Sequence, residues 1–417
     1  MRYLLGFFIL AIVGGGAFFV LTKEKMVEIS QNLLTDFQTQ QDNKKPIVQN
    51  ADIEPQKPLA DPPKEIKAIY LTAWSAGNFK KINEIIKLIK NTELNAVVID
   101  IKDYSGYVAY DTDIPEVKKY EAEKIMISKI NSLIKKLHDE NIYVIARITI
   151  FQDPTLAKAR PDLAIHSKNK LAANEQKLTN KTLWLDNKKL SWIDPAAKEA
   201  WDYNVAIAKD AANRGFDELN FDYIRFASDG NLNDMAFPSW DDKIKKQEVI
   251  KTFFQYLRGQ LSGIKISADL FGLSTINDGD LGIGQIIENA YQYFDYVAPM
   301  VYPSHYAKGF LGYKNPAEHP YEVVKYSIDS AVVRLNNYEL KIMNNATTTD
   351  ITTTETQNSK LRPWLQDFDL GAKYDARMVK YQMRAVYDAA STTPELINGW
   401  MLWNPSNSYT REALSGE

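Results

Sequence analysis

Eight short runs rich in apolar and β-branched residues follow one another from residue 66 onward, and amphipathic helical stretches separate them. The runs cover residues 66–74, 95–103, 142–151, 216–226, 265–272, 294–303, 361–368 and 398–405. Strands that alternate with helices indicate βα units and a parallel sheet, and eight is the strand number of a closed barrel. We therefore predict an α/β fold of the (β/α)8 TIM-barrel type, with an open doubly wound sheet as the alternative.

The stretches between the runs carry apolar residues three and four positions apart, which is typical of helices with one buried face. These positions are Ile82, Ile85, Ile86 and Ile89, then Ile127, Ile130, Ile134 and Leu137, then Ile250, Phe253, Leu257 and Leu261. Asp194 and Pro195 are predicted to begin a helix that Gly215 ends. Residues 152–193 form a long insertion, expected to be a small hairpin or a lid, and residues 344–358 a Thr-rich surface loop. Only twelve residues follow Pro405, so we expect a stunted eighth helix.

The first 64 residues differ in character from the rest of the chain. Residues 3–22 are uncharged, and 20 residues can span the ~30 Å hydrocarbon core of a bilayer as a helix. The apolar run continues past Gly15, Gly16 and Ala17, which favours an uncleaved anchor over a cleaved signal peptide. We predict a transmembrane anchor over residues 1–22, a polar Pro-containing linker over 23–64 and the barrel over 65–417. This order leads us to expect a single-pass protein of the cell membrane with its barrel on the extracytoplasmic side.

Composition excludes several classes of function. Lys and Arg number 50 and Asp and Glu 53, so a net charge of −3 gives no electrostatic reason to expect a nucleic-acid partner. The chain has no cysteine, and its four histidines show none of the spacings of metal hydrolases, so we predict no metal and no cofactor. A metal-dependent hydrolase of amides or phosphoesters, built on Asp100, Asp103, Asp222 and Asp269, stays open as an alternative.

Two carboxylates end neighbouring predicted strands. Glu218, Asn220 and Asp222 share one face of the fourth strand, with Asp222 nearest its end, and Asp269 occupies the same end of the fifth. The active site of a (β/α)8 barrel lies at these carboxyl ends. Cleavage of a glycosidic bond needs one carboxyl group to protonate the leaving oxygen and a second as nucleophile or base. We predict Asp222 and Asp269 as this catalytic pair, although caps and Arg partners are the structural alternative.

The remaining strand ends supply aromatic and planar polar side chains, which suit a carbohydrate cleft. The residues predicted to bind substrate are Asp103, Arg147, Tyr302, His305, Trp364, Gln366 and Trp403. Among them, Arg147 can also hold a carboxylate in its ionised form. Further polar or aromatic strand-end residues are Tyr70, Thr72, Trp74, Asp100, Lys102, Met300, Arg362, Asp367, Trp400 and Asn404. For Trp364 and Trp400, the sequence leaves open whether the ring faces the barrel interior or the helices.

Several motifs in order, among them IYLTAWSAG, VVIDIKDYSGYVAY, GFDELNFDYIRF, SADLFG and DYVAPMVYPSHY, resemble an uncharacterised bacterial family of glycoside hydrolase domains. The resemblance covers residues 66–405 and implies an α-amylase-like TIM barrel, active on carbohydrate and often tethered to a membrane. In the α-amylase-like pattern, the fourth strand ends in a nucleophilic Asp, which Asp222 matches, and the fifth in a Glu acid/base. Asp269 stands at that second position with a shorter side chain. In the chitinase-type motif the catalytic Glu would stand at Ile224, which disfavours chitinase chemistry.

The sequence thus predicts a membrane-anchored glycoside hydrolase that cleaves a poly- or oligosaccharide. We expect a retaining mechanism, with Asp222 as nucleophile and Asp269 as general acid/base. The shorter acid at position 269 motivates an alternative, which is a non-catalytic carbohydrate-binding barrel at the cell envelope.

Overall fold

The computed structural model describes residues 51–345 and 358–414. The predicted anchor, residues 23–50 of the predicted linker and most of the predicted Thr-rich loop lie outside the described residues. Within the described ranges, no helix is both long and apolar enough to cross a bilayer. Residues 52–417 form a compact unit of their own, and the following description concerns that unit.

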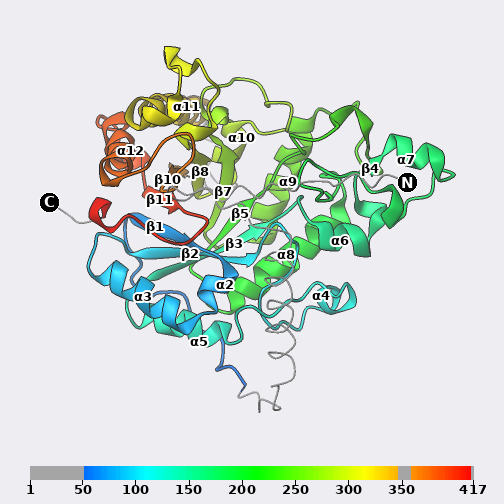
Figure 1. The fold of residues 1–417 in the computed structure, drawn as a ribbon, viewed down its shortest axis with the longest axis horizontal. Coiled ribbons are helices and arrows are strands. Elements are labelled where there is room, and N and C mark those ends of the chain that lie inside the picture. The colour runs from blue at the N-terminus through cyan, green and yellow to red at the C-terminus, as the bar shows by residue number, and fades with distance from the viewer. Residues whose placement is uncertain (1–50, 346–357, 415–417) are drawn as a thin grey trace, which may run out of the picture. The chain divides into compact units, whose positions relative to one another are not determined.

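Eight parallel strands form a closed barrel in chain order (Figure 1). They are β1 (Ile66–Leu71), β2 (Ala96–Lys102), β3 (Tyr143–Thr149), β5 (Glu218–Asp222), β7 (Ile266–Phe271), β8 (Tyr296–Met300), β10 (Trp364–Gln366) and β11 (Gly399–Trp403). Strand β10 pairs with β11 on one side and with β8 on the other, where Trp364 lies opposite Met300. This last pairing closes the ring, so the prediction of a (β/α)8 barrel is confirmed and the open sheet is excluded.

Helices surround the barrel and connect its strands (Figure 1). They are α2 (Ala73–Ala76), α3 (Phe79–Lys90), α4 (Pro115–Lys119), α5 (Ile130–His138), α6 (Pro154–Ala159), α7 (Lys168–Ala173), α8 (Lys198–Asn213), α9 (Lys246–Gln260), α10 (Ile287–Tyr291), α11 (Pro320–Asn345) and α12 (Ala376–Ala389). Short strand β9 (Lys360–Leu361) pairs with β8 just before β10. Among the described residues after β11, which end at position 414, the one helical element is the 3-10 turn Arg411–Ala413, and this confirms the expected stunted end.

Period-two alternation along the strands creates two separate cores. One core packs the outward side chains of the strands against the helices, and Ile82, Ile85, Ile86 and Ile89 of α3 belong to it as predicted. The other core fills the barrel interior and includes Ala68, Val98, Ile145, Trp364 and Met401. Because each strand points alternate residues inward, the polar residues at the inward positions near the strand ends meet at the barrel mouth.

A fully buried ion pair lies at the opposite, amino-terminal end of the interior. Both Glu218 carboxylate oxygens accept hydrogen bonds from Arg362 Nη1 at 2.9 Å. The guanidinium also donates to Asn398 Oδ1 at 2.8 Å and lies 3.8 Å from the centre of the Tyr296 ring. Burial of both charges is tolerated because their hydrogen-bonding capacity is largely satisfied within the barrel.

Residues 52–64, at the end of the predicted linker, lie against the barrel. The Asp52 carboxylate accepts hydrogen bonds from the backbone N–H groups of Asn131 and Ser132 in the first turn of α5, at 2.6 and 3.1 Å. This helix has no cap of its own, so Asp52 satisfies donors that would otherwise lack a partner. Leu59 packs against the interior core, and its N–H donates to the Asp217 carboxylate at 2.6 Å.

One predicted helix start is wrong, and the matching helix end is right. Asp194 does not cap α8, which begins at Lys198 after Ala197. Its carboxylate instead accepts hydrogen bonds from the N–H groups of Ser239 and Trp240, at 2.7 and 2.9 Å, in the loop before α9. Gly215 follows α8 with φ +100°, and a Cβ atom there would lie 2.5 Å from the Gln56 carbonyl oxygen. Gly215 therefore ends α8 through a left-handed backbone conformation that only glycine adopts here without strain.

The insertion at residues 152–193 is joined to the loop that follows β5. Its short strand β4 (His166–Ser167) pairs with β6 (Met235–Ala236) from that loop, and within the insertion His166 also bridges to Leu183. The indole N–H of Trp184 donates to the Asn231 carbonyl at 2.9 Å. The expected hairpin is therefore only partly right, because the ladder partner of β4 comes from a different loop.

We predict that Glu218→Ala lowers the free energy of unfolding by about 3–5 kcal/mol, because it leaves the buried Arg362 without its counter-charge. Urea denaturation of the variant measures this loss. Glu140→Ala serves as the control, since it removes an exposed pair with Lys90 that is worth less than about 1 kcal/mol. Similar losses for the two variants would contradict the importance of the buried pair.

Candidate active site

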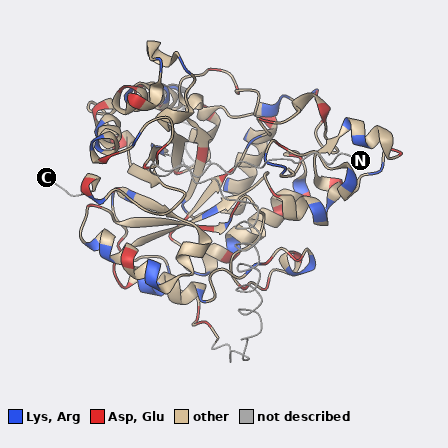
Figure 2. Ribbon diagram, in the orientation of Figure 1, with Lys and Arg blue, Asp and Glu red and all other residues tan. Residues whose placement is uncertain are grey.

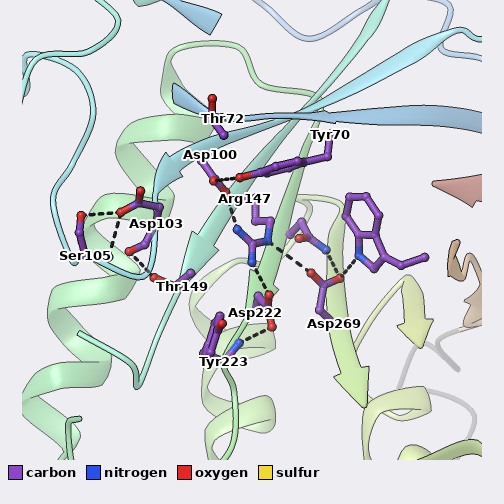
Figure 3. Close-up of polar contacts among 12 residues, drawn as sticks. Tyr70, Thr72, Asp100, Asp103, Ser105, Arg147, Thr149, Asp222, Tyr223 and Asp269 are labelled. Atoms are coloured by element: carbon purple, nitrogen blue, oxygen red, sulfur yellow. Dashed lines mark hydrogen bonds and ion pairs between the residues drawn. The ribbon is translucent and has the colours of Figure 1, made fainter. Parts of the chain in front are cut away.

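One guanidinium lies among three buried carboxyl groups at the barrel mouth (Figure 3). Arg147, on β3, donates from Nη1 to Asp100 Oδ1 at 2.5 Å and forms a short ion pair from Nη2 to Asp222 Oδ2. Its Nε lies 3.7 Å from Asp269 Oδ2 and has no hydrogen-bond partner among the residues that the structure describes. Burial opposes its charge, but Asp100 and Asp222 outweigh this and raise the pKa of Arg147 above its ordinary value. Arg147 therefore stays positively charged and connects the three carboxyl groups at the barrel mouth.

Asp100 connects Arg147 to the ring of Tyr70. The Tyr70 hydroxyl donates to Asp100 Oδ2 at 2.5 Å, while Asp100 Oδ1 receives the bond from Arg147. Both carboxylate oxygens are therefore used inside the protein. Burial, followed by the charge of Asp100, raises the pKa of Tyr70, so the phenol stays a hydrogen-bond donor at every physiological pH. With only 3 % of its side chain exposed, Asp100 is placed to orient Arg147 rather than to meet a ligand.

Asp269, on β7, is almost completely buried, with 1 % of its side chain exposed. Its Oδ1 accepts hydrogen bonds from Asn220 Nδ2 and from the indole N–H of Trp364, both at 2.8 Å. Burial and then the neighbouring Asp222 charge raise the pKa of Asp269 to about 8, although Arg147, Asn220 and Trp364 act in the opposite direction. Since Oδ1 already has two donors, the proton belongs on Oδ2, which faces Arg147. Near neutral pH this carboxyl group is a proton donor.

Asp222 ends β5 and is held from two sides. Its Oδ1 accepts a hydrogen bond from the Tyr223 N–H at 2.6 Å, and Oδ2 contacts Arg147. Tyr223 has φ +52°, a left-handed conformation that is uncommon for a residue with a Cβ atom. This turn directs its N–H back to the carboxylate, and such strain tends to concentrate at functional sites. Asp222 keeps 9 % of its side chain exposed, so a carboxyl group paired with Arg147 is accessible at the mouth.

An aromatic wall borders the charged cluster. Trp403, on β11, stacks on Tyr70 with ring centres 3.8 Å apart, and its ring centre lies 4.9 Å from the guanidinium carbon of Arg147. Trp364 meets Trp403 edge to face at 5.5 Å. Both predicted tryptophans therefore face the barrel interior, next to the carboxyl groups. Trp400 belongs instead to the core beneath the helices.

Two more predicted residues lie in the segment after β8. Tyr302 is buried, and its hydroxyl forms no hydrogen bond within the described residues. Burial and the charges of Asp269 and Asp222 raise the pKa of Tyr302, which keeps it a neutral phenol. His305 is exposed, contacts the Tyr302 ring edge to face at 5.2 Å and bonds through Nδ1 to Ser304 Oγ at 3.0 Å. Tyr302 thus presents a free hydroxyl near the pair, and His305 lies on the rim.

Gln366 and Asp103 bond to loops rather than to the carboxyl cluster. Gln366 Oε1 accepts from the Ser304 N–H at 3.2 Å, and its Nε2 donates to the Phe368 carbonyl at 2.9 Å. The Asp103 carboxylate accepts from the N–H and hydroxyl of Ser105, and Figure 3 shows it apart from Arg147. Both arrangements favour a role in shaping the loops over direct contact with a ligand.

The alternation of side chains along the strands does not predict the positions of Lys102, Asp100 and Tyr223 correctly or completely. A register shift after Asp100 in β2 turns Lys102 outward, where its Nζ pairs with Asp153 at 2.7 Å in a fully buried contact. Asp100 follows Ala96 and Val98 on the inward face of β2, so this spacing could have identified it as a partner of Arg147. No comparable pattern in the sequence marks Tyr223, whose contribution is a backbone N–H.

Neither the charge distribution nor the arrangement of possible metal ligands favours a nucleic-acid-binding protein or a metal-dependent hydrolase. Acidic and basic residues are interspersed along the outer helices in Figure 2. In the part of the chain that the structure describes, no group of three or more acidic or histidine side chains is placed to hold a metal ion. At the mouth, the Arg147 guanidinium occupies the centre of the acidic cluster.

The comparisons with known proteins agree with the barrel architecture. A family model described as "Putative glycosyl hydrolase domain" matches residues 68–409. The glycoside hydrolase domain of PgaB (BpsB) from Bordetella bronchiseptica is similar in structure, with a TM-score of 0.55 and 13% identity over 85% of this chain and 100% of that one. No curated protein matches the sequence.

Two further solved structures are similar over part of their length or at lower scores. A hypothetical protein from Ruminiclostridium thermocellum is 39% identical over 48% of this chain and 96% of that chain, with a TM-score of 0.43. An α-galactosidase from Thermus thermophilus is 8% identical over 84% of this chain and 60% of that chain, with a TM-score of 0.46.

We predict that Asp269→Asn makes the protein more resistant to unfolding at pH 8 than the wild type. The pKa of Asp269 is about 8 in the folded chain, whereas an unfolded Asp titrates near about 3.9. Between these values the unfolded chain releases a proton that the folded chain keeps, so wild-type stability falls as pH rises. Thermal unfolding from pH 4 to pH 8 measures the difference, which should widen with pH. A constant difference would contradict the raised pKa.

Proposed function

The chain belongs to the family described as "Putative glycosyl hydrolase domain", and from this premise we propose that it cleaves a poly- or oligosaccharide by a retaining mechanism. The observation that carries this proposal is the pairing of a carboxylate held by Arg147 with a second carboxyl group whose pKa lies near 8. Two carboxyl groups with opposite protonation at neutral pH are what a glycosidase requires.

In the first step, an oxygen of ionised Asp222 attacks the anomeric carbon, and the bond to the leaving sugar oxygen breaks. Asp269 transfers its proton to that oxygen, so the leaving group departs as an alcohol. Asn220 and Trp364 donate to Oδ1 and thereby stabilise the Asp269 carboxylate that forms. Arg147 contacts both groups and compensates for their changing charge.

In the second step, water attacks the anomeric carbon and the bond to Asp222 breaks. Asp269, now ionised, takes the proton of the water and returns to its starting state. Two inversions at one carbon give net retention. The free hydroxyl of Tyr302 and the half-buried ring of Trp403 are placed to bind the sugar next to this bond.

We predict that Asp222→Asn abolishes hydrolysis and that Asp269→Asn lowers kcat by about 10²- to 10⁴-fold, because general acid catalysis is lost. Release of reducing ends from a panel of labelled polysaccharides measures this for the full chain. The wild-type rate should fall above about pH 8, as Asp269 loses its proton. NMR of the first product formed should show the anomeric configuration of the substrate.

Arg384→Gln, which changes an exposed arginine on α12, is the control for these variants. Unchanged hydrolysis by Asp222→Asn would contradict its assignment as nucleophile, and an inverted first product would contradict the retaining mechanism. Glycan binding without any product would favour the alternative of a non-catalytic carbohydrate-binding barrel.

We also propose that residues 1–22 anchor the enzyme in the cell membrane and that the barrel acts on the extracytoplasmic side. The uncharged stretch over residues 3–22 supports this proposal. An alkaline phosphatase reporter fused to the carboxyl terminus should be active and should sediment with membranes. A reporter that is active only when it is retained in the cytoplasm would contradict the orientation.

A further inference from the structure

Arg225 is a buried cation beside the mouth that the mechanism above does not use. It lies three residues after Asp222, and only 7 % of its surface is exposed. Its guanidinium carbon lies 4.5 Å from the ring centre of Phe271, 4.8 Å from that of Trp192 and 5.3 Å from that of Tyr223. Three aromatic rings from three mouth segments therefore surround one positive charge.

The hydrogen bonds of Arg225 use only one edge of its guanidinium. Nη1 donates to the Phe226 carbonyl at 3.0 Å and to Ser228 Oγ at 3.1 Å. Within the described residues, neither Nε nor Nη2 forms a hydrogen bond, and neither atom is completely enclosed by the protein. These two neighbouring donors point the same way, which is the geometry that binds a planar carboxylate with two parallel hydrogen bonds.

No carboxylate of the described residues lies within ion-pair distance of this guanidinium, unlike the situation at Arg147. Burial lowers the pKa of Arg225 against the smaller, opposing effects of Tyr223, Asp222, Asp229 and Asp186. A buried charge without a counter-ion is costly, so its presence calls for an explanation. The bonds from Nη1 anchor the loop, but a neutral donor would serve that purpose equally well.

The position of Arg225 relates it to the reacting carboxyl groups. Tyr223, which covers one side of it, donates its N–H to Asp222, and Phe271 ends the strand that carries Asp269. A sugar bound over the Asp222 and Asp269 pair would thus lie on the ends of the same two strands, β5 and β7, from which Arg225 and the Phe271 ring extend. This shared position connects Arg225 with the binding surface of the proposed hydrolase.

We propose that Arg225 binds the carboxylate of a uronic acid in the substrate, so that the enzyme acts on an acidic glycan. This inference rests on the proposed function and deepens it by naming a substrate class. The aromatic rings around the guanidinium exclude water and thereby strengthen a charge-assisted pair. A carboxylate bound there would supply a direct ion-pair partner, whereas Asp222, Asp229 and Asp186 act on the guanidinium only from beyond ion-pair distance.

The test compares acidic polysaccharides with their own neutral forms. Oligosaccharides from pectate, alginate and hyaluronan are each prepared as the uronate and as the carboxyl-reduced product, which differ only at that group. Affinity by calorimetry and kcat/KM are measured for each pair with the full chain. We expect the wild type to prefer at least one uronate about 10- to 100-fold over its reduced form.

Variants assign that preference to the side chain. Arg225→Gln should bring the ratio of uronate to reduced form close to one, and Arg225→Lys, which keeps the charge but not the paired donors, should give an intermediate ratio. Arg384→Gln, which removes an exposed charge on α12, is the matched control, and its ratio should stay near that of the wild type. Circular dichroism and thermal unfolding check that each variant is folded.

Equal affinity for both members of every pair, or an unchanged ratio in Arg225→Gln, would overturn the inference. A sulfated carrageenan oligosaccharide bound more tightly than every uronate would overturn the choice of carboxylate. Hydrolysis that depends on Asp222 but not on the carboxyl group of the substrate would leave the proposed function intact and refute uronate binding by Arg225. Selective binding of a uronate without any hydrolysis would refute the proposed function and leave the role of Arg225 intact.

Discussion

The contact of Arg147 with three carboxyl groups is the constraint on which the rest of the mouth depends. Three ionised carboxylates and one guanidinium would leave two negative charges buried without compensation, which is strongly unfavourable. The two carboxyl groups in closest contact with the guanidinium are Asp100 and Asp222, whereas Asp269 lies 3.7 Å from Nε. Burial, followed by the neighbouring charge of Asp222, raises the pKa of Asp269, so this carboxyl group keeps its proton near neutral pH. The single guanidinium thus forms a short ion pair with Asp222 and a longer contact with Asp269.

Much of this arrangement could be predicted from the sequence, because it follows from period-two geometry. Alternation along the eight runs locates the strands and places Asp222, Asp269 and Arg147 at one end of the interior, whereas it leaves the face of Trp364 open. Their mutual contacts could not be predicted, since these depend on strand register and tilt around the closed ring. The same rule led to the inclusion of Gln366, which does point inward but is covered by the loop that carries Ser304. Alternation gives the direction of a side chain and says nothing about what a loop places over it.

Residues in loops were the harder part to predict, for a physical reason. Asp194 with Pro195 has the composition of a helix start, but its carboxylate is more completely satisfied by two N–H groups from a distant loop. Arg225 sits in a loop without periodicity, and its surroundings come from segments about 30 to 45 residues away in the chain. Tyr223 acts through its backbone, so no side-chain pattern reports it. Such features depend on tertiary contacts that local sequence does not encode.

The pairing of β4 with β6 makes the insertion after β3 and the loop after β5 a single structural body. Trp184, Asn187 and Ser167 in the insertion all bond to residues 229–234 of the other loop. Neither segment can be shortened or exchanged alone, because the other would be left with unsatisfied donors and an uncovered indole. Any transfer of the insertion or of this loop to another barrel, by recombination or by design, has to move both segments together.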